Sequence, residues 1–105
     1  MIEITVKKNE IGIYNGLCVK GHAGYDEYGK DIVCAAVSVL VINTLNSVET
    51  FTKDVLTVNT DEVSGLIEFE VVSEISQETR LLLDSLLLGL QGVKTDYGKN
   101  FIKIM

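Results

Sequence analysis

Hydrophobic and polar residues alternate over the first part of the chain in the pattern of two β-strands. Within residues 2–6, each isoleucine or valine is followed by a polar residue, which is the two-residue period of a strand with one buried face. A polar turn follows, and residues 11–21 form a second candidate strand in which Gly12 and Gly16 are possible bulge points. We expect the two strands to pair as a hairpin.

The pattern then changes to the spacing of a long helix over residues 31–51. Asp31 is a residue type that caps helix N-termini, and apolar residues follow it at intervals of three and four. A one-sided helix keeps its outer face polar, but this one has further apolar residues off the main stripe, at Ile32, Ala35, Ala36, Val39 and Ile42. We therefore expect the helix either to be covered on two sides or to contact another subunit.

The second half of the chain again predicts two strands followed by a helix. Residues 54–61 and 65–72 flank a polar turn, and Ser76 can begin a helix with a wide leucine-rich face. Residues 101–105 alternate once more and suit a short closing strand. The order ββαββαβ, with no internal linker or repeat, predicts a single α+β domain over residues 1–105. Its two helices pack on a mostly antiparallel sheet.

The charge of the chain argues against one class of binding partner, nucleic acid. The chain has 105 residues and a formal charge of −6, from 15 acidic and 9 basic residues, and the basic residues are scattered rather than gathered in a stripe. Proteins that bind nucleic acid neutralise phosphates with clustered Lys and Arg. Direct binding of nucleic acid is therefore not expected.

Neither a membrane span nor a secretory signal is expected. Polar residues interrupt the apolar runs well before the roughly 18 uninterrupted residues of a membrane span. The first ten residues lack the basic-then-apolar order of a secretory signal. We expect a cytoplasmic protein with reduced thiols and no membrane contact.

Two cysteines and one histidine exclude several kinds of site. They are too few for a four-ligand zinc centre, and there is no Cys-x-x-Cys pair for redox cycling. The glycines near residue 24 are not followed by the Lys-Ser/Thr of a phosphate-binding loop. We expect no metal and no cofactor. Cys18 lies mid-strand and is interpreted as a packed or half-exposed structural thiol, and a Cys18–Cys34 disulfide is possible but disfavoured in the cytosol.

Candidate chemistry is concentrated around the single histidine. Cys34 falls in the first turn of the predicted helix, where free N–H groups and the helix dipole stabilise a thiolate. His22, at the end of the preceding strand, would take the thiol proton and return it to a leaving amine, while first-turn N–H groups hold the oxyanion. Strict alternation would turn His22 outward unless Gly21 breaks it. The alternative is a buried cysteine and an unrelated surface histidine.

Two further residues in this stretch have possible supporting roles. Asp31 can cap the helix through its carboxylate or instead orient the imidazole of His22, and capping is favoured because it is the ordinary use of Asp there. Ser38 lies one turn after Cys34. Its hydroxyl is expected to bond back to the Cys34 carbonyl rather than to assist catalysis.

The segment between histidine and cysteine has no periodicity and is predicted to be a loop. It contains Gly24, Tyr25, Tyr28 and Gly29. The glycines can act as hinges of a mobile lid that carries the two tyrosines toward a substrate. Ordinary loop flexibility explains the same residues equally well.

The sequences GHA and GKDIVCAAVS, separated by this glycine-containing loop, resemble those of the ribosomal-processing cysteine proteases, the small bacterial Prp or YsxB-like family. The similarity extends over essentially the whole chain. It implies that Cys34 is the nucleophile and His22 the general acid/base of a cytoplasmic peptidase. It also implies a homodimer and a loop that moves when substrate binds.

The same resemblance implies a substrate, the N-terminal extension of large-subunit ribosomal protein bL27, whose removal supports ribosome assembly. The family's cleaved segment ends in paired aromatic residues before a small residue and lysines. An acidic enzyme favours encounter with a basic substrate of this kind. The alternative function is a non-catalytic ribosome-assembly module that binds the peptide without cutting it.

Overall fold

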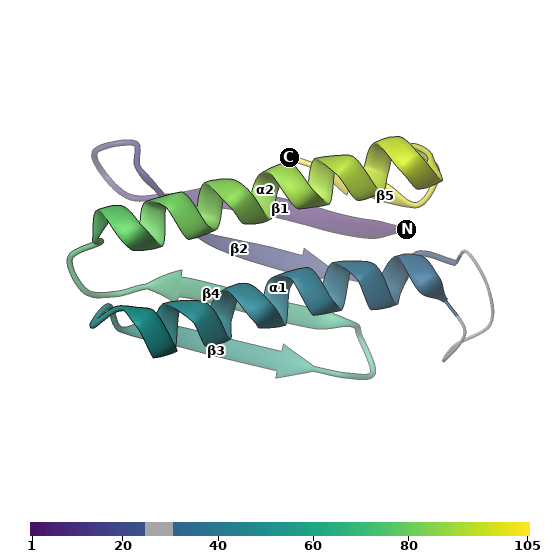
Figure 1. The fold of residues 1–105 in the computed structure, drawn as a ribbon. Helices are drawn as coiled ribbons and strands as arrows, with labels where there is room; N and C mark the ends of the chain where they lie inside the picture. The colour runs from purple at the N-terminus through teal and green to yellow at the C-terminus, as the bar shows by residue number, and fades with distance from the viewer. Residues whose placement is uncertain (25–30) are drawn as a thin grey trace.

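All seven elements expected from the sequence pattern are present, and in the expected order. The structure is a computed structural model, and it describes residues 1–24 and 31–105. The elements are β1 (Ile2–Lys8), β2 (Tyr14–Lys20), α1 (Ile32–Phe51), β3 (Leu56–Asp61), β4 (Leu66–Val71), α2 (Gln77–Tyr97) and β5 (Ile102–Ile104) (Figure 1). The order ββαββαβ is therefore confirmed.

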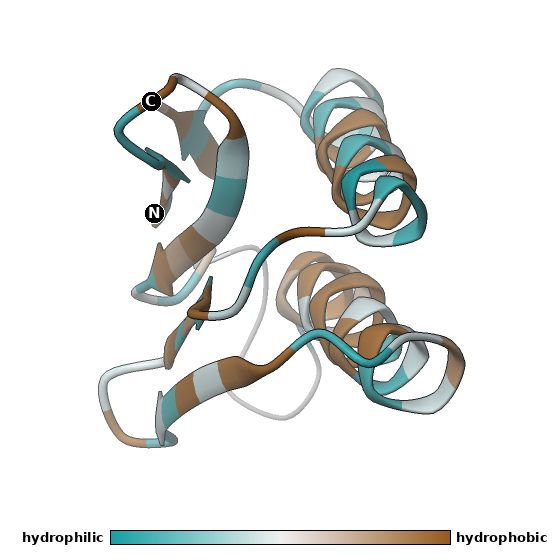
Figure 2. Cartoon of the chain, turned by 90° about the vertical axis from the view of Figure 1, so that its left-hand side faces the viewer, coloured by the Kyte–Doolittle hydropathy of each residue, from teal (hydrophilic) through white to brown (hydrophobic). Residues whose placement is uncertain are grey.

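The five strands form one sheet in the order β3-β4-β2-β1-β5. Neighbouring strands are antiparallel except β1 and β5, which are parallel. Both helices lie on the same face of this sheet, so the protein has two layers (Figure 2). The mostly antiparallel α+β sheet predicted from the sequence is confirmed. The parallel pair arises because the connection through α2 returns the chain to the far edge of the sheet, beside β1.

The second strand begins later than expected, at Tyr14 rather than near residue 11. The side chain of Asn9 accepts hydrogen bonds from the N–H groups of Ile11 and Ile13, at 3.1 and 2.9 Å. These amides are used in the turn and are not available for pairing between strands. The register shift of the hairpin falls opposite Lys7 and Lys8, next to Gly16, one of the two expected bulge points.

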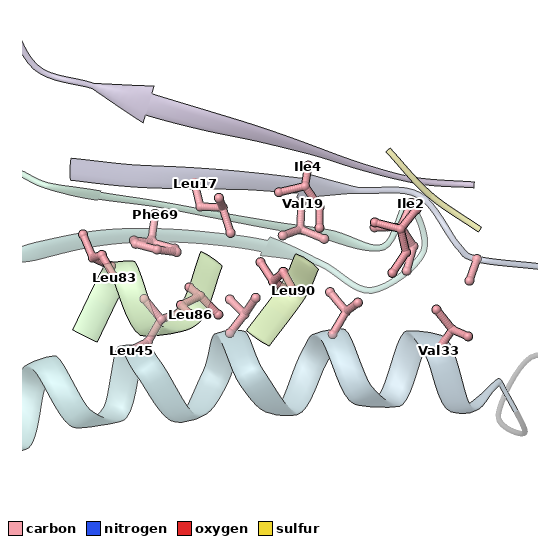
Figure 3. Close-up of a cluster of buried hydrophobic side chains, with 14 of the residues drawn as sticks. Ile2, Ile4, Leu17, Val19, Val33, Leu45, Phe69, Leu83, Leu86 and Leu90 are labelled. Atoms are coloured by element: carbon pink, nitrogen blue, oxygen red, sulfur yellow. The ribbon is translucent and has the colours of Figure 1, made fainter. Parts of the chain in front are cut away.

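The core lies between the sheet and the helices, and its side chains come from alternate strand positions and one stripe of each helix (Figure 3). The sheet contributes Ile2, Ile4, Leu17, Val19 and Phe69, all nearly or fully buried. The helices contribute Val33, Val37, Val41 and Leu45 from α1, and Leu83, Leu86 and Leu90 from α2.

Helix α1 is covered on one side within the described part of the chain. Among its off-stripe residues, Ile32, Val39 and Ile42 are exposed, and Val39 is 66% exposed. Within its described residues, this chain alone therefore does not cover α1 on two sides, which was the first of the two expected alternatives. By length and composition α1 would also suffice for a membrane span, which the interrupted apolar runs did not predict. That is weak evidence, because the core helix of a soluble protein passes the same test.

Helix α2 begins at the predicted capping residue. The Ser76 hydroxyl accepts a hydrogen bond from the N–H of Thr79 at 3.2 Å. Asp54, just before β3, accepts hydrogen bonds from the N–H and hydroxyl of Ser76, at 2.9 and 2.8 Å. Burial raises the pKa of Asp54, but the hydrogen bonds from Thr79 and Ser76 outweigh it and hold that pKa below its ordinary value. These bonds fix the start of α2 to the segment before β3.

Candidate active site

A cavity of about 860 Å³ lies between the first half of α1 and the strand ends nearest to it. His22 and Cys34 both line this cavity, together with the buried apolar residues Ile2, Val19 and Val37. The sequence-predicted pair therefore shares one hollow that is large enough for several peptide side chains. The other described lining residues are Gly21, Gly24, Asp31, Ala35, Ser38, Ile42, Thr60, Asp61, Glu62, Gly65, Leu66 and Ile67.

Cys34 occupies the first turn of α1, as its spacing predicted. Its Sγ atom accepts a hydrogen bond from the N–H of Ala23, with an N–S distance of 3.2 Å. Ala23 is the residue directly after His22, so this bond holds the sulfur against the segment that carries the imidazole. A hydrogen bond donated to sulfur also stabilises negative charge on it.

Asp31 caps α1, which is the favoured one of its two expected roles. One oxygen of its carboxylate accepts the N–H groups of Val33 and Cys34, both at 3.0 Å. The N–H of Ala35 donates to the backbone carbonyl of Asp31, also at 3.0 Å. Three N–H groups of the helix start are thus occupied in this structure, so the oxyanion site expected there is not formed by them.

The charge state of Cys34 differs from the sequence-based expectation. Burial raises the pKa of the Cys34 thiol above its ordinary value, and the Asp31 carboxylate raises it further through a hydrogen bond and its charge. The hydrogen bond from the N–H of Ala23 lowers this pKa, but by less than burial and Asp31 raise it. The expectation of a thiolate stabilised by the helix N-terminus is therefore wrong for this state. The cap places a carboxylate where the helix would otherwise favour a negative sulfur.

His22 faces the cavity rather than the outer face of the sheet. Strict alternation from Cys18 would point it outward, but β2 ends at Lys20 and Gly21 adopts a φ of +93°, a conformation that favours glycine. This residue breaks the alternation. The Nε2 atom of His22 lies 3.1 Å from the carbonyl oxygen of Val63, in the turn between β3 and β4.

The structure bears on only some of the predictions for Ser38 and the loop residues. Ser38 lines the cavity, and the expected bond from its hydroxyl to the Cys34 carbonyl is not formed among the described residues. Gly24 also lines the cavity. The lid prediction for Tyr25, Tyr28 and Gly29 lies outside the described residues.

Cys18 is a free, half-buried thiol, as expected, and Cys34 is free as well. Cys18 pairs with Glu68 across β2 and β4, between buried neighbours that face the helices, so it belongs to the outer face of the sheet. Burial and the charge of Glu68 raise the pKa of the Cys18 thiol. Within residues 1–24 and 31–105, no group of three or more His, Cys, Asp or Glu side chains is placed to hold a metal ion.

The β3–β4 connection contributes to the site, which the local sequence pattern did not predict. Thr60, Asp61 and Glu62 line the cavity, and Val63 provides the carbonyl partner of His22. This contact spans 41 positions in the chain. Gly65, two positions after Val63, was the one local sign of an unusual turn.

The arrangement suits nucleophilic attack on a peptide by a thiol whose proton passes to a nearby imidazole. Comparisons with known proteins agree with that chemistry. The family model of the cysteine protease Prp matches residues 1–102. The ribosomal processing cysteine protease Prp of Staphylococcus aureus is 30% identical over 100 residues, which are 95% of this chain and 94% of the relative.

Two crystal structures of the Staphylococcus aureus protease are also similar. The complex with a covalently linked product peptide has a TM-score of 0.89 and 30% identity, covering 99% of this chain and 97% of that one. The complex with a substrate peptide has a TM-score of 0.85 and 28% identity, covering 100% and 98%. On sequence and fold together, this chain belongs to the Prp family of ribosomal processing cysteine proteases and is a protease rather than a non-catalytic binding module.

Proposed function

We propose that this protease removes the N-terminal extension of large-subunit ribosomal protein bL27, with Cys34 as nucleophile and His22 as general acid/base. The observation that carries the proposal is the placement of the Cys34 sulfur, 3.2 Å from the N–H of the residue that follows His22, in a cavity that both side chains line. The relatives from Staphylococcus aureus are ribosomal processing proteases, which favours a ribosomal substrate.

The reaction begins from a neutral thiol, because the pKa of Cys34 is raised in the free enzyme. As Cys34 attacks the scissile carbonyl carbon, His22 accepts the thiol proton and the carbonyl oxygen becomes an oxyanion. The tetrahedral intermediate collapses, the C–N bond breaks, and His22 gives the proton to the leaving amine. The acyl group is then a thioester on Cys34. A water molecule attacks this thioester while His22 accepts one of its protons. The C–S bond then breaks, His22 returns that proton to the sulfur, and the released carboxylic acid loses its remaining proton to solvent.

The lining of the cavity supports a peptide with apolar residues near the cleaved bond and basic residues close by. Ala35, Leu66 and Ile67, which are exposed or half-buried, offer apolar surface to the former. Asp61 and Glu62 carry negative charge, and no Lys or Arg is found among the described lining residues. The net charge of −6 adds a long-range attraction for a basic protein. A segment with paired aromatic residues followed by a small residue and lysines matches these properties.

Cleavage of the extended ribosomal protein tests the proposal. The enzyme is incubated with bL27 carrying its extension, and the products are identified by mass spectrometry. We expect one cut, lost in Cys34→Ala and reduced by at least a hundredfold in His22→Ala. Cys18→Ala is the matched control, because this thiol belongs to the outer face of the sheet, and it should retain activity. Intact substrate with the wild-type enzyme, or equal cleavage by Cys34→Ala, would refute the assignment.

We further propose that the protein is a homodimer that associates through the exposed apolar side chains of α1. Ile32 and Val39 lie about two helical turns apart, and Ile42 lies about one turn after Val39, along one face, and all are exposed in the monomer. Sedimentation equilibrium at micromolar concentration should give twice the chain mass. Val39→Glu should shift it to the monomer, whereas Leu88→Glu on α2 should not. A monomeric wild-type protein contradicts this proposal.

We also propose a cytoplasmic location. Both cysteines are free thiols in the structure, which is usual in a reducing compartment. The proposed substrate is a ribosomal protein, and it is available there. Recovery of the enzyme from the membrane fraction of lysed cells would argue against this location.

A further inference from the structure

The turn between β3 and β4 lies against the segment that carries His22. The N–H of Gly21 donates to the carbonyl of Ser64 at 3.0 Å. The Nε2 atom of His22 is 3.1 Å from the carbonyl oxygen of Val63. Two consecutive carbonyl groups of the turn therefore accept hydrogen bonds from two consecutive residues after β2.

This close approach depends on a glycine at position 65. Gly65 has a φ of +66°, and its N–H donates to the carbonyl of Glu62 at 3.3 Å, which closes the turn. A Cβ atom there would lie 2.4 Å from the carbonyl oxygen of Gly21 and 3.2 Å from Cε1 of the His22 ring. Any larger residue would push the turn away from the imidazole. The N–H of Val63 is held in addition by the Asp61 side chain at 3.1 Å.

The partner of His22 in the turn determines which ring nitrogen carries hydrogen. A backbone carbonyl can only accept, so Nε2 must donate in this bond. In the neutral ring, the lone pair that can take a proton is then on the other nitrogen, Nδ1.

We propose that the turn of residues 62–65 is a positioning device for the general base. The carbonyl of Val63 fixes the tautomer of His22 with hydrogen on Nε2, so that Nδ1 exchanges the proton with Cys34, and Gly65 permits the approach. Val63 and Gly65 are positioning residues that act through His22. This inference rests on the proposed catalytic role of His22, but the tautomer itself can be measured without any substrate.

Nitrogen NMR of the free enzyme gives the first test. His22 is the only histidine in the chain, so a long-range ¹H–¹⁵N spectrum of uniformly labelled protein contains one imidazole pattern. For the neutral ring, we expect the pattern of the Nε2–H tautomer. A dominant Nδ1–H tautomer overturns the proposal. Since no substrate is involved, this result is distinguishable from failure to cleave bL27.

The second test compares alanine substitutions at two glycines that both have a positive φ. Gly12 in the β1–β2 turn has a φ of +82°, and a Cβ there would meet nothing within 4 Å. Gly65→Ala and Gly12→Ala should therefore lower the melting temperature similarly, apart from the added clash at Gly65. Only Gly65→Ala should lower kcat, by at least tenfold with a smaller change in KM, and shift the tautomer signal.

Unchanged kcat in Gly65→Ala, or an equal loss in Gly12→Ala, would overturn the inference. If Gly65→Ala does not fold, the tautomer of the wild-type enzyme still decides the question. If the wild type has the Nε2–H tautomer but cleaves no ribosomal substrate, the positioning of His22 stands and the proposed substrate fails.

Discussion

The Asp31 carboxylate has two effects on the site, and a pair of substitutions separates them. It accepts the N–H groups of Val33 and Cys34 at the start of α1, and it raises the pKa of the Cys34 thiol. Asp31→Asn keeps an acceptor oxygen for the two N–H groups but removes the charge. Asp31→Ala removes both. Comparing the two variants therefore separates helix capping from control of the thiol.

The loss of stability can be estimated from the cap. Replacing a capping side chain by alanine costs about 0.5–2 kcal/mol. Asp31 is buried and accepts two N–H groups, which places Asp31→Ala in the upper half of that range, at about 1.5–2 kcal/mol. For a domain of this size each kcal/mol lowers Tm by about 4–8 °C, so the expected decrease is about 6–16 °C. Asparagine caps nearly as well, and Asp31→Asn should lose less than about half as much.

The thiol is followed by alkylation with iodoacetamide at pH 7, with the modified peptide quantified by mass spectrometry. Both variants should alkylate faster at Cys34 than the wild type, because removal of the carboxylate lowers the thiol pKa and increases the thiolate fraction. Cys18, which pairs with Glu68 on the other face of the sheet, is the internal reference and should not change. Slower alkylation in Asp31→Asn, or equal losses of Tm in the two variants, would refute the reasoning.

Three further measurements test other parts of the structure. Alkylation of Cys34 in the free wild-type enzyme should increase mainly above the ordinary pKa of a thiol, because its own pKa is raised, and a rate already at its plateau by pH 7 would contradict this. Asp54→Asn should lower the free energy of unfolding by about 1–2 kcal/mol in urea at pH 7. Folding lowers the pKa of Asp54, so the stability difference between the wild type and Asp54→Asn should be fully present above the pKa of the unfolded state. It should disappear as the pH falls through the pKa of the folded state. A difference that persists at pH 2 would argue against this reasoning. Leu90→Ala should cost about 2–5 kcal/mol, whereas the exposed Leu88→Ala should cost about 0.5 kcal/mol or less, and similar losses would be inconsistent with the described core.

Much of the fold could be predicted from the sequence because the periodicity of apolar residues reports which face of an element is buried. Ile2 and Ile4 alternate with polar residues and are indeed in the core. The start of β2 could not be predicted in this way, because it depends on the side chain of Asn9 binding the amides of Ile11 and Ile13. The pairing of β5 with β1 is not encoded in the local pattern of either strand.

The candidate site was predictable where it depends on local features. A cysteine three residues after a capping aspartate is visible in the sequence, and both occupy the expected places. The pKa of Cys34 was not predictable, since it depends on burial and on how near the carboxylate of Asp31 lies to the sulfur. The direction of His22 depends on the φ angle of Gly21, and its partner Val63 is remote in the chain.

The two-layer arrangement has a consequence for inhibition. Cys34 belongs to the helix layer, whereas His22 follows the central strand of the sheet. The separation of sulfur and imidazole is therefore set by how the layers pack against each other, and the cavity lies between them. A compound that wedges itself into this space and spreads the layers would disable the enzyme reversibly. It would need no electrophilic group that reacts with the Cys34 thiol.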